Sequence, residues 1–323
     1  MLDVDESLLQ AAASALSRNR PFALVQYPDG VAEFLDLTGA DAARFRPSAF
    51  PEAGCKPFEA RSTSFDDYAR AVYSLVAELE ATGGKAVVSR LISLTAAASP
   101  VAVAATYFEA CPGTFRALFL TPATGLWILA TPELLLRRTA DGTLFTMSLA
   151  GTRPVGTDGE WDDKNRREHD YVTRHITATM RAHGLSPVVA PPCSLPFGSV
   201  EHLCERITAT GDADFDALLA DLSPTPAVCG YPTADALRQI DRCESHPRGC
   251  YGGYIAVSRG EEREAYVTLR CARITPAADG SYTYSIFAGG GITSQSEACC
   301  EWREAEAKAA PLLNAINHTI DNA

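Results

Sequence analysis

Apolar residues recur every three or four positions along several stretches of the chain, a spacing that places them on one face of a helix. Helices are predicted over residues 64–80, 163–182, 215–222, 233–242 and 297–318. In the second of these, Val172, Ile176 and Met180 mark the face that is expected to be buried.

Other stretches are rich in β-branched and aromatic residues and end at proline or glycine, as strands do. Strands are predicted over residues 85–94, 117–120, 125–130, 134–138, 145–149, 252–258, 265–274 and 282–288. Several of them follow one another with only a turn between. This favours antiparallel sheets with helices packed on them, an α+β fold rather than a strict strand–helix alternation. Residues 1–75 are the least regular, and we expect a few strands and no chemistry there.

Length and composition indicate a folded protein. The 323 residues are 46% apolar, enough for a sizeable core, and we expect a single domain over residues 1–323, with residues 1–80 its least certain part. A net charge of −12 argues against nucleic acid and anionic membranes as partners. The chain holds no apolar run of ~20 residues, and its start is acidic, which predicts a cytoplasmic protein.

The ten cysteines include no C-x-x-C pair. Zinc-ribbon spacing is therefore absent, and we interpret the cysteines as reduced thiols, many of them buried.

Carboxylates interrupt the apolar faces of two predicted helices. Glu168 lies four residues before Val172, so it begins the buried face of its helix. Glu301, Glu304 and Lys308 share one face of the last helix. Carboxylates that converge from two helices form an oxygen-ligand site that suits Mg²⁺. The alternative is a solvated face, since Glu304 and Lys308 also form a favourable i,i+4 ion pair.

Two further ionisable residues accompany apolar runs. Lys85 opens a strand whose same-side neighbours include Val87 and Leu91, and a lysine without solvation can act as a base. Glu133 lies between Pro132 and three leucines, and a buried glutamate can stay protonated and act as an acid. The alternatives are an exposed lysine at the strand end and an exposed glutamate in a turn.

A glycine run and an arginine offer anion sites. The three glycines from Gly289 to Gly291 let backbone N–H groups approach a ligand, although such a run also makes an ordinary sharp turn. Arg270 lies in an otherwise uncharged strand segment, where a guanidinium could clamp a carboxylate or form an internal ion pair with Asp or Glu.

Taken in order, nine segments resemble the chorismate-utilising enzymes, which include isochorismate, salicylate, anthranilate and aminodeoxychorismate synthases. They are KAVVSRLI (85–92), TPELLL (131–136), SLAGTRP (148–154), KNRREHDYV (164–172), PTPAVCGYP (224–232), RGCYGG (248–253), TLRCA (268–272), FAGGGI (287–292) and EWREAEAK (301–308). The resemblance runs from Lys85 to the C-terminus. It implies two α/β subdomains that form a layered, largely antiparallel sheet core, with helices outside and the site in the cleft between them.

The resemblance also implies residue roles. Glu168 and Glu304, with Glu301 beside them, would bind Mg²⁺, which would hold the ring carboxylate of chorismate. The residues expected to hold the enolpyruvyl carboxylate and to supply positive charge are Gly151, Thr152, Tyr251, Arg270, Gly289 and Lys308.

In family members that add water, the position of Lys85 is a lysine that activates the nucleophile, whereas members that add ammonia generally lack it. Lys85 therefore favours an isochorismate synthase, an isomerase in which Lys85 deprotonates water and Glu133 protonates the departing hydroxyl. A salicylate synthase is the nearest alternative, an amino-transferring synthase is a second, and a non-catalytic chorismate-binding module is a third. We expect a monomer without a glutaminase subunit.

The sequence departs from the family at Ser223, where a histidine is common before Pro-Thr-Pro. A serine there cannot supply the charge of an imidazole. The sequence shows no sign of a fused lyase domain, which favours the menaquinone pathway over a siderophore pathway.

Overall fold

The computed structural model describes residues 4–38, 43–46 and 60–322. Cys55 and most of the Pro- and Gly-rich segment around it lie outside these ranges. The nine described cysteines are free thiols, five of them buried.

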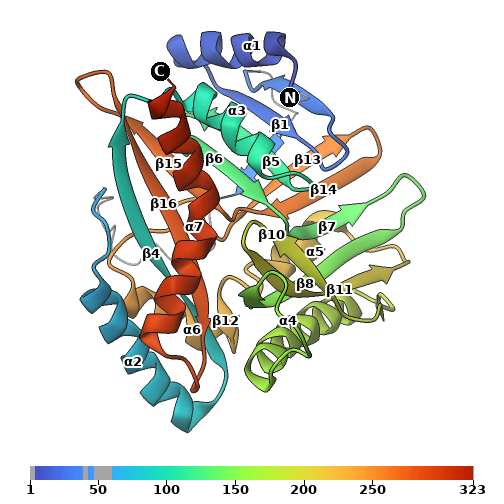
Figure 1. Cartoon of the computed structure of the whole chain (residues 1–323). Helices are drawn as coiled ribbons and strands as arrows, with labels where there is room; N and C mark the ends of the chain where they lie inside the picture. The colour runs from blue at the N-terminus through green and yellow to red at the C-terminus, as the bar shows by residue number, and fades with distance from the viewer. Residues whose placement is uncertain (1–3, 39–42, 47–59, 323) are drawn as a thin grey trace.

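Two antiparallel sheets form the centre of the molecule (Figure 1). The first has the strand order β12-β4-β16-β15-β6-β5-β1-β2. Its strands are β1 (Phe22–Gln26), β2 (Ala32–Asp36), β4 (Lys85–Ala96), β5 (Phe115–Thr121), β6 (Gly125–Thr131), β12 (Gly230–Tyr231), β15 (Cys271–Pro276) and β16 (Tyr282–Ile292). The long pair β4 and β16 is joined in register along its whole length and supplies the floor of the site described below.

The second sheet has the order β10-β11-β8-β7-β14-β13-β3, and β9 pairs with β11 off this path. Its strands are β3 (Ala43–Arg46), β7 (Leu134–Arg138), β8 (Leu144–Pro154), β9 (Val188–Val189), β10 (Cys193–Phe197), β11 (Val200–Ala209), β13 (Tyr254–Arg259) and β14 (Glu262–Val267). An apolar core joins the two sheets, with Phe115 stacked on Tyr266 and Phe119 on Phe45.

Seven described helices cover the outer faces: α1 (Glu6–Ser17), α2 (Phe65–Thr82), α3 (Pro100–Ala110), α4 (Asp163–Ala182), α5 (Phe215–Leu222), α6 (Thr233–Cys243) and α7 (Ala298–Asp321). Helices α1, α3 and α7 pack on the first sheet, and α4 and α5 pack on the second. Asp162 caps α4 by accepting a hydrogen bond from the Asn165 N–H, which fixes where that helix begins. These layers confirm the predicted α+β fold.

The predicted helix bounds hold for α4 and α5, and α2, α6 and α7 differ by one to three residues at an end. The single strand predicted over 265–274 is wrong: β14 ends at Val267 and β15 begins at Cys271, because Arg270 has a φ of 50° that a strand cannot contain. Helices α1 and α3 and strands β9–β11 were not predicted. Helix α3 is apolar on most sides, so it lacks the alternation of polar and apolar residues that marks a surface helix.

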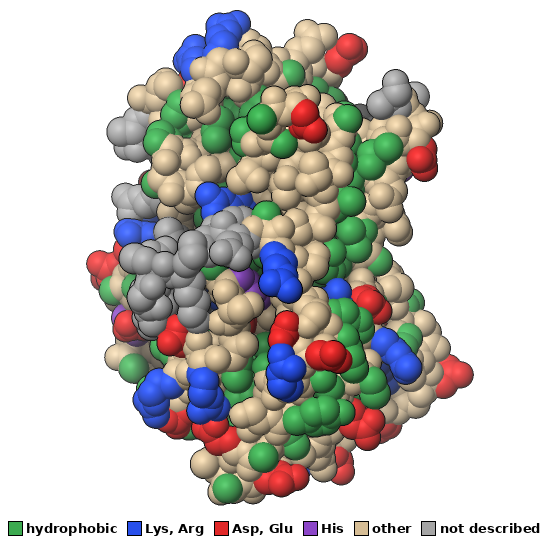
Figure 2. All heavy atoms as spheres, turned by 90° about the vertical axis from the view of Figure 1, so that its left-hand side faces the viewer, with side chains coloured by type: hydrophobic (Ala, Val, Ile, Leu, Met, Phe, Trp, Pro, Cys, Tyr) green, Lys and Arg blue, Asp and Glu red, His purple; other side chains and the backbone are tan. Residues whose placement is uncertain are grey.

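Charge is mixed on the face that contains α2 and α7. Figure 2 shows acidic and basic side chains interspersed there among apolar ones, rather than an area of one sign. Among the described residues, no helix is both long and apolar enough to span a membrane.

Candidate active site

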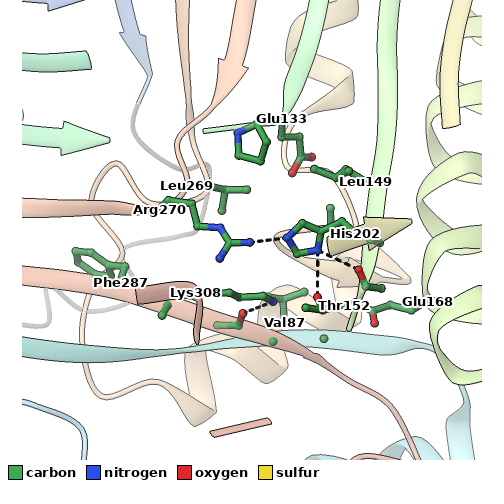
Figure 3. A pocket seen from close by; sticks show the side chains of 18 of the residues that line it. Val87, Glu133, Leu149, Thr152, Glu168, His202, Leu269, Arg270, Phe287 and Lys308 are labelled. Carbon is green, nitrogen blue, oxygen red and sulfur yellow. Dashed lines mark hydrogen bonds between the residues drawn. The ribbon is translucent and has the colours of Figure 1, made fainter. Parts of the chain in front are cut away.

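A pocket opens between the two sheets and contains about 600 Å³ of space, part of it open to solvent. Strands β4, β8, β11 and β16 and helices α4 and α7 contribute to its wall. Eight of the residues predicted from the sequence line it: Glu133, Gly151, Thr152, Glu168, Tyr251, Arg270, Gly289 and Lys308. Figure 3 shows Arg270 and His202 pointing toward one another in its middle, with Glu133 above them in the view and Lys308 and Glu168 below.

The other three predicted residues, Lys85, Glu301 and Glu304, lie directly behind this wall. Lys85 is fully buried and donates to Glu168 Oε1 at 3.0 Å. Lys308 donates to Glu304, one helical turn before it on α7, and to the Gly289 carbonyl oxygen at 3.0 Å. The i,i+4 pair expected on a solvated face therefore exists, but it faces the pocket.

A third lysine, Lys164, was not predicted as a site residue. It lies on α4 one turn before Glu168 and donates to Glu301 Oε1 on α7 at 2.6 Å. Each of the three acidic side chains thus has its own lysine. The charges balance locally, although the chain as a whole is strongly acidic. An i,i+4 pattern of Lys164 with Glu168 was visible in the sequence, but nothing there indicated that the lysine reaches another helix.

The glycine run explains how three carboxylates fit against one strand. A Cβ atom on Gly291 would lie 2.2 Å from Glu168 Oε1, and one on Gly290 would lie 2.7 Å from Glu301 Oε2. Neither glycine has a left-handed φ, so closeness rather than backbone conformation requires glycine at these two positions.

These carboxylates suit a divalent cation. Glu301 Oε2 is buried and has no hydrogen-bond partner, and burial together with the neighbouring Glu304 charge raises the pKa of Glu301. An unpartnered buried oxygen beside two further carboxylates is a donor set that Mg²⁺ uses, with water completing its shell. In the described part of the chain, three side chains that can ligate a metal have their ligand atoms within 4.8 Å of one another at the start of α7. They are Glu297, Cys299 and Cys300. Glu168, Glu301 and Glu304 do not form such a group, and each is paired with its own lysine.

Lys85 and Glu133 are both buried, so the alternatives of an exposed strand-end lysine and an exposed turn glutamate are wrong. Burial raises the pKa of Glu133 to about 8, although the Lys85 charge and a long hydrogen bond of 3.5 Å from Thr225 Oγ1 oppose the shift. A carboxyl group with this pKa is largely protonated at neutral pH and can donate a proton.

Arg270 meets a histidine rather than the acidic partner that the sequence left open. Its Nη2 lies 2.6 Å from His202 Nε2, and its backbone carbonyl accepts from the Tyr107 hydroxyl at 2.8 Å. Burial and the Arg270 charge hold the pKa of His202 well below its usual range. The neutral ring can then donate from Nδ1 to the Gly151 carbonyl oxygen at 3.0 Å and accept from Arg270 at Nε2.

Sequence reasoning missed His202, which lies on the unpredicted strand β11. Its only local signal is a histidine in a short segment that also contains Val200 and Leu203. The Arg270 Nη1 atom is buried without a hydrogen-bond partner. Its guanidinium faces the pocket with unused donor capacity, as a site for an anionic ligand requires.

The loop that carries Tyr251 is held by a buried ion pair. Arg248 contacts Glu244 and donates to the carbonyl oxygens of Val87 and Val228, so the loop is tied to β4. Tyr251 is itself buried and stacks on Phe287 with ring centroids 5.5 Å apart. Its hydroxyl would contact a Cβ at Gly289, which places it beside the glycine run.

The fold and this pocket define a class of α+β enzymes that bind a small anionic ligand between two antiparallel sheets. The sequence matches the model of the family described as "Chorismate binding enzyme" over residues 36–317. The chain belongs to the chorismate-binding enzyme family, and the match begins well before the first motif at Lys85.

Individual relatives agree with this assignment. The isochorismate synthase MenF of Escherichia coli is 36% identical over 194 residues, which are 57% of this chain and 44% of that protein. Anthranilate synthase component 1 of Halobacterium salinarum is 32% identical over 204 residues, 58% of this chain and 38% of that protein. The matched region is thus about half the length of these relatives or less.

Among solved structures, E. coli MenF, described as the menaquinone-specific isochorismate synthase, superposes with a TM-score of 0.76 at 22% identity. The superposition covers 92% of this chain and 88% of the MenF chain. At this identity the likeness supports the fold.

Proposed function

We propose that the protein is a Mg²⁺-dependent isochorismate synthase that interconverts chorismate and isochorismate. The observation that carries the proposal is the fully buried Lys85, which reaches Glu168 in the pocket wall, together with the buried, protonatable Glu133 that lines the same pocket. A base and an acid are thereby available to one bound molecule. The combination suits a reaction that adds water at one ring carbon and removes a hydroxyl group, as water, from another.

In the proposed reaction, Lys85 takes a proton from a water molecule as the water oxygen attacks C2 of the ring. Glu133 gives its proton to the hydroxyl at C4, which leaves as water while the ring double bonds shift. One water enters and one leaves, and the transferred proton returns from Lys85 to Glu133 before the next turnover. General acid and base catalysis each contribute roughly 10²- to 10⁴-fold in such reactions.

Glu168, Glu301 and Glu304 would hold Mg²⁺, which when bound supplies positive charge opposite the ring carboxylate. Glu168 Oε1 already accepts from Lys85. The carboxylate of Glu168 would thus serve the ion and also orient the Lys85 amine. Arg270, Tyr251 and the backbone at Gly151 and Gly289 would hold the enolpyruvyl carboxylate.

The similarity to an anthranilate synthase component favours one second candidate, the addition of ammonia instead of water. Purified protein should be incubated with chorismate and Mg²⁺, with and without ammonium, and the products separated by chromatography. We expect isochorismate in both reactions. Anthranilate or aminodeoxychorismate would contradict the proposal, and salicylate would show that pyruvate elimination follows isochorismate formation.

The variant Lys85→Ala tests the assignment of Lys85 as the base. It should remove turnover while the protein still unfolds cooperatively and still binds chorismate. Turnover near the wild-type rate would remove the base assignment.

A further inference from the structure

A contact between two tyrosines, Tyr171 and Tyr231, lies beside the ion pair of Lys85 with Glu168. Tyr231 on β12 is the Cα partner of Lys85 on β4, and cross-strand partners place their side chains on the same face of a sheet. Tyr171 lies three residues after Glu168 on α4, which places it on the same side of that helix. The Tyr171 and Tyr231 rings stack with centroids 5.0 Å apart and planes 20° apart. The ion pair thus joins β4 to α4, and the ring pair joins the neighbouring strand β12 to the same helix.

The backbone under Tyr231 is closely fitted to β4. A Cβ atom on Gly230 would lie 2.2 Å from the Lys85 carbonyl oxygen, and one on Gly84 would lie 2.1 Å from the Tyr231 carbonyl oxygen. Gly230 on β12 and Gly84 just before β4 therefore allow this approach, and Tyr231 is fixed in position relative to Lys85.

The side chains are less exposed to solvent at Lys85 than at the two tyrosines. β12 is the end strand of the first sheet in the described part of the chain. Tyr231 is 38% exposed and Tyr171 is half-buried, whereas the Lys85 side chain is 0% exposed although β4 is only the second strand from the edge. The Tyr231 ring thus lies on the edge strand, beside the strand that carries Lys85. Figure 1 shows β12 and α4 facing each other at this edge.

We propose that Tyr171 and Tyr231 form an aromatic clasp between the two halves of the molecule, which shields Lys85 from bulk water and holds it toward the pocket. Neither tyrosine is assigned a contact with substrate, so both are positioning residues, and their catalytic consequence rests on the proposed function of Lys85. The stacked rings add contact energy beyond burial, and they exclude water, which would compete with the substrate water for the amine.

The experiment uses the small number of lysines in the chain, at positions 56, 85, 164 and 308. The full-length protein is pulsed with acetic anhydride, and the acetylation of each lysine is measured by mass spectrometry. Lys308 serves as the internal reference because its side chain is 14% exposed and it lies on α7, away from the clasp. Tyr171→Ala and Tyr231→Ala are compared with wild type, with the two Tyr→Phe variants and with Tyr73→Ala, which removes an exposed tyrosine from α2.

Both alanine variants should acetylate Lys85 several-fold faster relative to Lys308, and they should lower kcat more than they change KM. The phenylalanine variants keep the stack and should resemble wild type in both measurements, as should Tyr73→Ala. A wild-type Lys85 to Lys308 ratio in both alanine variants overturns the clasp, and so does an equal rise at every lysine. The labelling ratio needs no turnover. A raised ratio with unchanged kcat would therefore keep the clasp and contradict the role of Lys85 as the base.

Discussion

Lys164 on α4 donates to Glu301 on α7 at 2.6 Å, across 137 positions of sequence. This bond joins the two helices that supply the acidic side chains, so it fixes the distance between the two parts of the candidate metal site. The Glu301 side chain is 2% exposed, which leaves water little access to it if the lysine is lost.

Lys164→Met should therefore destabilise the protein. Removal of one partner from a buried ion pair leaves an uncompensated charge and typically costs about 3–5 kcal/mol, and the partial exposure of Lys164 places the expected loss at or below the lower end. Chemical denaturation measures the free energy of unfolding. Lys164→Met combined with Glu301→Gln should recover most of the loss, and a single variant as stable as wild type would show that the pair contributes little.

Gly291→Ala tests the close approach of Glu168 to β16. The added Cβ would lie 2.2 Å from Glu168 Oε1, so the carboxylate must move away from Lys85. We expect weaker Mg²⁺ binding by calorimetry and a loss of turnover. The free energy of unfolding should change less than these two properties. Gly290→Ala is the matched comparison, since its Cβ meets Glu301 at 2.7 Å instead. Unchanged Mg²⁺ affinity in both variants would show that the glycines at positions 290 and 291 are not needed for metal binding.

The raised pKa of Glu133 predicts that the protein becomes less stable as the pH rises toward 8. The folded state holds the proton up to about pH 8, whereas the unfolded chain releases it near the ordinary value of 4.5. The folded state thus binds more protons in this window, and the free energy of unfolding falls as the pH rises through it. At about 1.4 kcal/mol for each unit of pKa difference, the change amounts to a few kcal/mol.

Glu133→Gln removes this titration, so its free energy of unfolding should vary less between pH 5 and pH 8 than that of wild type. The variant should also lose turnover, while wild-type turnover should decline above pH 8 as the acid loses its proton. A wild-type slope in the variant would mean that another group is responsible.

His202 should act on ligand binding through Arg270. His202→Ala removes the acceptor at 2.6 Å from the guanidinium, so we expect KM for chorismate to rise by roughly tenfold, the equivalent of one lost hydrogen bond to a charged group. His202→Gln supplies another acceptor and should restore part of the affinity. Because the pKa of His202 is far below its usual range, wild-type KM should show no inflection near pH 6.5. Such an inflection would assign the histidine a charged form.

The sequence by itself determined most of the helices and strands, and it identified eight of the residues that line the pocket. Periodic apolar residues with an Asp cap fixed the bounds of α4, and Glu168 was identified there because it lies on the buried face. Periodicity and capping are local, acting over one or two helical turns, so they can be read from neighbouring residues. For the same reason Arg270 was placed in a continuous strand, since a single left-handed residue leaves no periodic signal.

Only the tertiary structure decided which charges meet. Lys85 reaches Glu168 across 83 positions, Arg270 reaches His202 across 68, and the clasp of Tyr171 with Tyr231 joins two elements that share no local pattern. Each contact depends on how the sheets and helices pack, and that of Lys85 with Glu168 depends also on the close approach of Glu168 to Gly291. Burial of a charged side chain is a property of the assembled layers, because residues from distant segments remove it from water, and no window of sequence contains them all.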